Sequence, residues 1–405
     1  MYGYGYRYNS GLVVGAGGGA PIDTTFKITV DTTKAGSASN TFVLKLHSGT
    51  TSMTVYWGDG NSDLITTYNQ AELTHVYASS GTYQISLDGS FAGINFNNAG
   101  DKLKLASIDN WGTNAWSSMY LSFGGCSNMV ANYTDNPDTS SVTTMFATFF
   151  GCSSFNGIIN FSTSNVTNMQ QMFHFCNNFN SSVTFSDTSN VTTMKQMFSG
   201  CGNFNNPLTF NCISVGSMNN IFDSCISFNS LPTFSNTSNV TDATRMFYNC
   251  TNFNKDVNFD LASVTTVKEM FYKASSFNKN ISFNLASCTN AQSMFLNCYA
   301  FNSPITLSNT SLIATFNSTF ANCTLFNQDI SGFSINTVTI ASNMLSGTAF
   351  STTNYDLLLV AWQGQTHNNS VTFHAGTAKY SSGAPATARA ALITDSWTIT
   401  DGGAV

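Results

Sequence analysis

A repeat of 24 or 25 residues occupies most of this chain. One copy, residues 164–180, reads SNVTNMQQMFHFCNNFN, and its C-x-x-F-N ending returns between about residues 119 and 350. An internal repeat of this length predicts a solenoid. The strongest columns hold a phenylalanine and, three residues later, a cysteine: Phe149 and Cys152, Phe173 and Cys176, Phe198 and Cys201, Phe222 and Cys225, Phe247 and Cys250, Phe295 and Cys298, Phe320 and Cys323. Ala274 fills the cysteine position in one copy.

Two periodicities divide each copy. Apolar residues at 169, 172, 173 and 176 follow the i, i+3, i+4, i+7 spacing, which predicts a short helix with one buried stripe. The alternation of Val183 and Phe185 then predicts a short strand. We expect the strands to stack in parallel at about 4.8 Å, so that each column meets its own equivalent in the next turn. Phenylalanine columns become buried ladders, and the asparagine after each F-N phenylalanine is expected to face inward and satisfy backbone groups.

The cysteine column has one architectural interpretation and three chemical alternatives. A buried cysteine behaves as a small apolar residue, which is the interpretation we favour. Disulfides between neighbouring turns are possible on distance, but parallel side chains are poorly aimed for the required dihedral. A column one residue wide cannot surround a metal ion. A thiol nucleophile needs a base, and His174 is the one histidine within the repeats. We therefore expect no catalytic residue, metal or cofactor.

The repeat resembles a known family. M-x-x-M-F-x-x-C-x-x-F-N followed by T-S-N-V-T is similar to the BspA-type leucine-rich-repeat surface proteins of bacteria and their phages. The resemblance implies a right-handed, leucine-rich-repeat-like solenoid, a role in adhesion and no catalytic residues. The overall expectation is a mainly β fold with short helices, in which residues 96–350 form the solenoid and its end turns are degenerate.

Residues 1–95 precede the repeat. Residues 1–25 are rich in Tyr and Gly and lack periodicity, so they are interpreted either as an attachment arm or as a disordered tail. Residues 26–95 alternate in short runs, which predicts a small β-sandwich. The motifs at 57–60 (W-G-D-G), 75–77 (H-V-Y) and 81–85 (G-T-Y-Q-I) resemble the PKD-type Ig-like domain, which implies a spacer.

An acidic turn lies within this predicted sandwich. Asp59, Asn61 and Asp63 are spaced like the start of a calcium loop, but Gln70 replaces the glutamate that such a loop needs at its twelfth position. A hairpin turn rich in Asp, Gly and Asn explains the same residues, and we favour it.

Residues 351–405 depart from the repeat and are expected to form a small α/β cap. One helix is predicted with Tyr355, Leu358, Leu359 and Trp362 on a single face, and another is predicted to begin near Pro385. Short strands are predicted around 371–376 and 396–400. Such a unit covers the open end of a solenoid, which otherwise exposes its core and strand edges.

Composition limits the partners. Charged residues are 8% of the chain and the net charge is −6, without a basic run. This argues against nucleic acid, which requires clustered Lys and Arg, and against an anionic membrane surface. No apolar stretch is long enough to span a membrane, so no membrane insertion is expected. Within the repeats, the variable columns bring five side chains onto adjacent turns as a candidate ligand-binding patch: Arg245, Tyr248, Lys268, Tyr272 and Lys273.

Three functions are compatible with these features. The first is a non-enzymatic structural and adhesive protein of a phage virion, such as a tail or head fibre. Residues 1–25 then bind other virion proteins, and the solenoid binds a glycan or protein of the host surface. The N-terminus does not resemble a signal peptide, which favours this hypothesis. The second is a bacterial cell-surface adhesin with the same domain layout. The third is a polysaccharide depolymerase, which requires paired carboxylates, whereas acidic residues are scattered here. Fibres of this kind are expected to be homo-oligomers.

Overall fold

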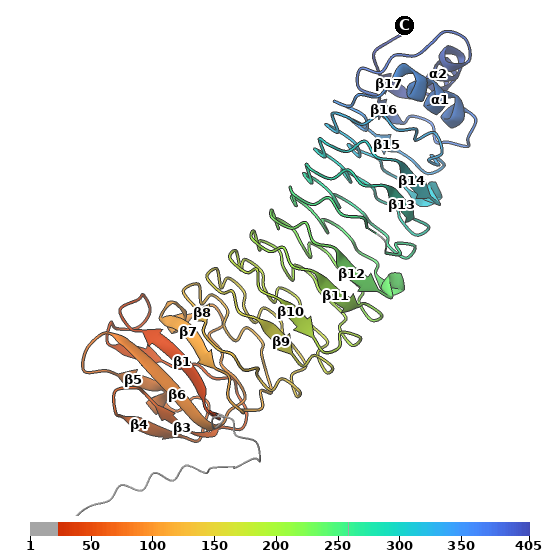
Figure 1. Cartoon of the computed structure of the whole chain (residues 1–405). Helices are drawn as coiled ribbons and strands as arrows, with labels where there is room; N and C mark the ends of the chain where they lie inside the picture. Colours follow the sequence, from red (N-terminus) through yellow and green to blue (C-terminus); the bar gives the residue numbers. More distant parts are fainter. Residues whose placement is uncertain (1–22, 258) are drawn as a thin grey trace, which may run out of the picture.

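The computed structural model describes residues 23–257 and 259–405 (Figure 1). The chain forms an elongated solenoid with a β-rich module at its N-terminal end and two helices at its C-terminal end. The predicted attachment arm, residues 1–25, lies almost wholly outside the described residues. Neither helix of the described chain is long and apolar enough to cross a membrane.

The N-terminal module has two sheets. The larger has the order β4-β3-β6-β1-β7-β8, and the smaller pairs β2 with β5. Its elements are β1 (Phe26–Asp31), β2 (Thr41–Val43), β3 (Ser52–Tyr56), β4 (Ser62–Ile65), η1 (Ala71–Leu73), β5 (Thr74–Val76), β6 (Thr82–Ser90), η2 (Gly100–Leu103), β7 (Leu105–Asn110) and β8 (Val130–Ala131). Apolar residues alternate along β1, with Phe26, Ile28 and Val30 buried.

The larger sheet joins the module to the solenoid. β1 pairs antiparallel with β6 on one side and with β7 on the other. β7 then pairs in parallel with β8, which lies in the first turns of the repeat. The sheet therefore continues past residue 95, and antiparallel pairing changes to the parallel stacking of the solenoid within one sheet.

The solenoid strands stack in parallel, as predicted. β9 (Ile159–Phe161) pairs with β10 (Val183–Phe185), β11 (Leu208–Asn211) with β12 (Pro232–Ser235), and β13 (Ile281–Asn284) with β14 (Ile305–Ser308). Equivalent repeat positions face each other, for example Phe161 and Phe185. A single parallel bridge also links each turn to the next, from Thr144 to β15 (Ile340–Ala341). Two 3-10 turns, η3 (Thr237–Asn239) and η4 (Thr310–Leu312), follow β12 and β14.

The segment predicted as a short helix in each repeat is a stack of tight turns, so that prediction is wrong. In the eight residues 169–176, the third and seventh residues, Gln171 and Phe175, have φ of 59° and 61°. An α-helix cannot contain these left-handed residues. The N–H groups of the first, third, fifth and seventh residues donate to carbonyls of the following turn at 2.8–3.1 Å, instead of bonding within a helix.

This pattern of hydrogen bonds has one direction. Met145, Ala147, Phe149 and Gly151 donate to carbonyls of the turn 168–174, and each later turn donates to its successor in the same way. Within the eight-residue segment, the bonds between turns therefore run from the N–H of one turn to the C=O of the next. The intervening N–H groups close local turns, as Cys176 does on Phe173 at 2.9 Å.

Phenylalanine ladders fill the core, as predicted. The ring of Phe173 stacks between those of Phe149 and Phe198, with centroids 5.5 and 5.4 Å away, and Phe179 lies 4.5 Å from it. The asparagine column differs from the expectation, because its side chains are exposed or half-buried rather than inward. Each still accepts a backbone N–H from the next turn, as Asn156 Oδ1 does from Asn180 at 2.8 Å.

The C-terminal unit extends the stack. Its elements are α1 (Thr352–Gln363), β16 (Thr372–His374), α2 (Ala384–Thr394) and β17 (Thr398–Thr400). The parallel sheet β15-β16-β17 continues the solenoid, and α1 packs beside α2. The buried residues of α1 are those predicted: Tyr355, Leu358, Leu359 and Trp362.

Candidate ligand-binding surface

The stacked turns place five predicted side chains side by side on the outside of the solenoid. We call Arg245, Tyr248, Lys268, Tyr272 and Lys273 the cation–tyrosine patch. The rings of Tyr248 and Tyr272 stack with centroids 4.7 Å apart and planes 3° apart. The Arg245 guanidinium lies 4.9 Å from the centre of the Tyr248 ring, and Lys273 Nζ lies 5.4 Å from that of Tyr272. Each tyrosine ring therefore has a cation within the distance of a cation–π interaction.

One carboxylate organises the cations of the patch. Arg245 Nε donates to Glu269 Oε2 at 2.5 Å, and Lys268 Nζ lies 3.8 Å from Glu269 Oε1. Burial lowers the pKa of Arg245, but the hydrogen bond and charge of Glu269 raise it by more. Sequence analysis did not select Glu269, although it occupies the same column as Arg245 on the next turn. The side chains of Arg245 and Lys268 remain 42% and 38% exposed, so both can reach a ligand.

A histidine, a serine and an aspartate occupy successive turns beside the patch, in the column of Tyr248. Their contacts do not form a catalytic triad. His174 Nδ1 lies 2.9 Å from the backbone carbonyl of Ser199, not from its hydroxyl. The Asp223 carboxylate accepts hydrogen bonds from Asn220 Nδ2 and Ser224 Oγ, both at 2.7 Å. Burial raises the pKa of Asp223 and lowers that of His174.

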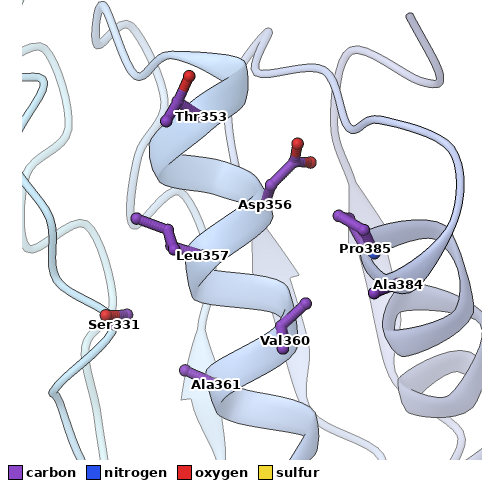
Figure 2. Close-up of a pocket in the computed structure, with 8 residues that line it drawn as sticks. All are labelled: Ser331, Thr353, Asp356, Leu357, Val360, Ala361, Ala384 and Pro385. Atoms are coloured by element: carbon purple, nitrogen blue, oxygen red, sulfur yellow. The ribbon is translucent and has the colours of Figure 1, made fainter.

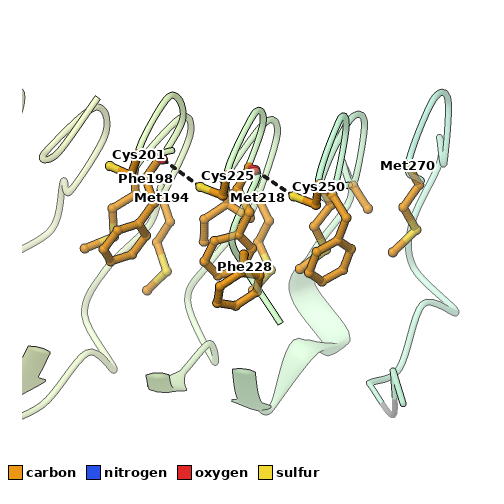
Figure 3. Packing of buried hydrophobic residues seen from close by; sticks show 14 of the residues in the cluster. Met194, Phe198, Cys201, Met218, Cys225, Phe228, Cys250 and Met270 are labelled. Atoms are coloured by element: carbon orange, nitrogen blue, oxygen red, sulfur yellow. Dashed lines mark hydrogen bonds between the residues drawn. The ribbon is translucent and has the colours of Figure 1, made fainter. Parts of the chain in front are cut away.

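The cysteines form a hydrogen-bonded ladder inside the solenoid. All ten are buried free thiols. Seven donate to the carbonyl of the ladder phenylalanine in the preceding turn; Figure 3 shows Cys225 bonded to Phe198 at 3.0 Å, and Cys250 donates to the Phe222 carbonyl at the same distance. Burial raises the pKa of the Cys176 and Cys225 thiols well above the ordinary value. These contacts favour the architectural interpretation, because a nucleophile requires a stabilised thiolate.

The motifs of the N-terminal module converge on one aromatic cluster. His75 stacks on Trp57 at 4.7 Å and meets the edge of Tyr77 at 4.6 Å, and the Tyr77 hydroxyl donates to the Trp57 carbonyl. The two carboxylates of the acidic turn are engaged there: Asp59 pairs with His75 at 2.9 Å, and Asp63 accepts from Trp57 Nε1 at 2.7 Å. The turn joins β3 to β4, as the hairpin interpretation expects.

A groove of about 540 Å³ opens beside α1 in the C-terminal unit. Figure 2 shows Leu357, Val360 and Ala361 along α1, with Ala384 and Pro385 at the start of α2. Leu357 and Val360 are 48% and 44% exposed. Asp356 is the one charged side chain in its lining. In the described part of the chain, no three His, Cys, Asp or Glu side chains are grouped to hold a metal ion.

Comparison with known proteins identifies the repeats. The model of the family DUF285, described as "Mycoplasma protein of unknown function", matches residues 92–209, 117–234, 179–282 and 257–362. Together these matches cover residues 92–362, which is more than half of the chain. No curated protein and no solved structure matches the chain. The repeat motif and the stacked fold fit a BspA-type repeat protein, and the chain belongs to the DUF285 family.

Proposed function

We propose that this protein is a structural and adhesive protein without catalytic activity, whose solenoid presents the cation–tyrosine patch to a glycan or protein on a cell surface. The observation that carries the proposal is the side-by-side placement of two stacked tyrosines and three cations on adjacent turns. The stack of the two rings and the bond of Arg245 to Glu269 already restrict these side chains, so less side-chain freedom is lost when a ligand binds.

The first test measures adhesion. Purified protein is added to a panel of intact bacterial strains, and bound protein is quantified for the wild type and for Tyr248→Ala/Tyr272→Ala. The matched control is Ser199→Ala/Leu296→Ala, which changes the same column outside the patch. We expect the tyrosine variant to lose at least tenfold in affinity and the control to bind like the wild type. Equal binding by all three proteins, on a strain that binds the wild type, excludes the patch as the adhesive site.

We also propose that the protein is part of a phage virion, with residues 1–25 anchoring it to other virion proteins as a homo-oligomer and the N-terminal module acting as a PKD-type spacer. Ten reduced, buried thiols are compatible with folding in a reducing compartment, where virions assemble. A second candidate is a bacterial cell-surface adhesin with the same layout. The match to a family described from Mycoplasma favours that candidate.

Mass spectrometry of two fractions from a producing culture distinguishes these locations. Purified released particles and washed cell envelopes are compared for the amount of the protein relative to capsid or tail proteins. A fixed ratio to those proteins in the particle fraction supports the virion proposal. Recovery in the envelope fraction alone replaces it with the cell-surface adhesin.

A further inference from the structure

The basic residues of the solenoid are concentrated in the turns that carry the patch. Between residues 120 and 350 the chain has six Lys and Arg residues, and five of them lie between residues 245 and 279: Arg245, Lys255, Lys268, Lys273 and Lys279. The same interval holds three acidic residues, Asp256, Asp260 and Glu269. Five cations and three anions give this interval a formal charge of +2. The remaining nine cations and 17 anions give the rest of the chain a formal charge of −8. The interval is therefore a positively charged segment of a negatively charged protein.

The cations of the patch retain capacity for an anionic ligand. Glu269 engages Arg245 through Nε alone, which leaves the two terminal guanidinium nitrogens for a planar carboxylate group or a tetrahedral sulfate group. Lys268 lies 3.8 Å from Glu269, a distance too long for a hydrogen bond. Lys273 takes part in none of the ion pairs found in the described residues. Two adjacent turns therefore carry three cations and one carboxylate, and Asp223 on the preceding turn is the second carboxylate whose charge acts on Arg245.

The surface around the patch is polar and small. The columns that hold Tyr248 and Lys273 continue on neighbouring turns with one large apolar residue, Leu296, and one charged residue, Asp223; the others are Ser199, Gly200, Ser224, Asn297, Ala321 and Asn322. A stable protein interface generally has an apolar core of several residues within roughly 800 Å² per partner, and these side chains do not offer one. Hydroxyl and amide groups around a positive centre instead match a ligand rich in hydroxyls that carries negative charge.

From these contacts we infer that the cation–tyrosine patch binds an acidic polysaccharide, with Arg245, Lys268 and Lys273 contacting its carboxylate or sulfate groups. This inference rests on the proposed adhesive function and names its ligand class. The Tyr248 and Tyr272 rings cover each other, Arg245 lies over the Tyr248 ring and Lys273 lies over the Tyr272 ring. The tyrosines therefore position the cations and offer their hydroxyl edges, rather than ring faces, to a sugar.

The repeat itself provides neutral replacements for the test. Gln171 and Gln196 occupy the column of Arg245, Gln292 that of Lys268, and Asn297 that of Lys273. The triple variant Arg245→Gln/Lys268→Gln/Lys273→Asn therefore removes three charges with residues the fold already accepts. Lys273 has φ of 60°, a conformation that asparagine tolerates better than lysine, so the variant is expected to fold. Lys195 shares the column of Lys268 three turns away, which makes Lys195→Gln the matched control.

The experiment measures affinity by isothermal titration calorimetry for alginate, which carries carboxylates, dextran sulfate, which carries sulfates, and uncharged dextran. We expect the wild type and Lys195→Gln to bind alginate or dextran sulfate at least tenfold more tightly than dextran, with affinity falling as salt rises. The triple variant is expected to lose at least tenfold on the same polymer. Which anionic polymer binds identifies carboxylate or sulfate as the recognised group.

Three results overturn the inference. One is dextran binding as tight as that of the charged polymers, and another is a triple variant that binds like the wild type. In both cases the adhesive function survives if Tyr248→Ala/Tyr272→Ala still loses cell binding. The third is binding of none of the polymers by a protein that adheres to cells, which assigns the patch to a different ligand class. A wild type that adheres to no strain contradicts the proposed function itself.

Discussion

The thiol ladder makes a quantitative prediction at Cys225, in the middle of the repeats. Its side chain is fully buried, and its Sγ donates to the Phe198 carbonyl at 3.0 Å, which also accepts the N–H of Cys201 at 3.0 Å. Cys225→Ala removes one buried atom about as large as a methyl group, worth about 1 kcal/mol, and leaves a small cavity. It also removes a weak S–H···O bond worth about 0.5 kcal/mol. We expect a loss of about 2 kcal/mol in the free energy of unfolding.

Serine separates the two roles of the thiol. Cys225→Ser retains a donor for the Phe198 carbonyl, and we expect it to lose about 1 kcal/mol, less than the alanine variant. Were the thiol only an apolar filler, serine would lose more than alanine, because burying a hydroxyl without a partner costs about 1–3 kcal/mol. Ala274→Cys places a thiol at the one repeat position of the column that lacks it, and we expect the free energy of unfolding to rise by about 1 kcal/mol.

Equilibrium urea unfolding, followed by far-UV circular dichroism, measures these differences. Repeat arrays can lose cooperativity, so the slope of the transition must match that of the wild type before midpoints are compared. An alanine variant as stable as the wild type refutes the reasoning. A serine variant less stable than the alanine variant would mean that the hydrogen bond to the Phe198 carbonyl does not contribute to the stability.

Three further predictions concern other parts of the molecule. Gly200 has φ of 77°, and an added Cβ would lie 2.5 Å from Phe175 Cδ1, so Gly200→Ala should lower the free energy of unfolding by at least about 1 kcal/mol. Melting temperatures should show that Phe175→Gly partly restores the stability of this variant. A double variant no more stable than Gly200→Ala contradicts the clash. Burial raises the pKa of Asp401, but hydrogen bonds, above all from Arg389, lower it overall. The stability that Asp401 contributes is therefore present at pH values above 3.8, the pKa of the carboxyl in the unfolded chain, and is lost as the pH falls below that value. Asp401→Asn should therefore flatten the pH dependence of the urea midpoint between about pH 5 and 3. An aromatic disulfide reagent should label none of the ten cysteines in the native protein at pH 8 and all ten in denaturant; rapid native labelling contradicts their burial.

The repeat made the parallel strands and the buried ladders predictable, because a fixed period places each residue above its own equivalent. The eight-residue segment that ends at each cysteine was misread, since its apolar spacing is also that of a helix. The contrary signal was the seventh position of the segment, which holds glycine or asparagine in most copies, at 151, 200, 249, 297 and 322, with Phe175, Ser224 and Lys273 as the exceptions. Glycine and asparagine are the residues that adopt positive φ most readily, and they mark a turn there.

The patch was predictable for the same reason, because neighbouring columns on adjacent turns must lie side by side. The pairing of Arg245 with Glu269 was not predicted, although both occupy one column 24 residues apart. The extension of the N-terminal sheet through β7 was also missed. β7 lies between the sandwich pattern and the first clear repeat, where no period of the sequence indicates its partner strand.

The single direction of the hydrogen bonds in the turn segment gives the solenoid a polarity. Four peptide groups per turn point along the axis, each with a dipole of about 3.5 D, and the N–H groups that donate to the preceding turn, such as those of Thr167 and Asn178, offset only part of the resulting macrodipole. Its positive pole is at the C-terminal end, the reverse of an α-helix. The two ends therefore need different chemistry: Phe96 donates its N–H to the Ser122 carbonyl at one end, and the His374 carbonyl accepts from Leu345 at the other. Whole repeats can be inserted or deleted between these ends, but the two terminal units cannot be exchanged.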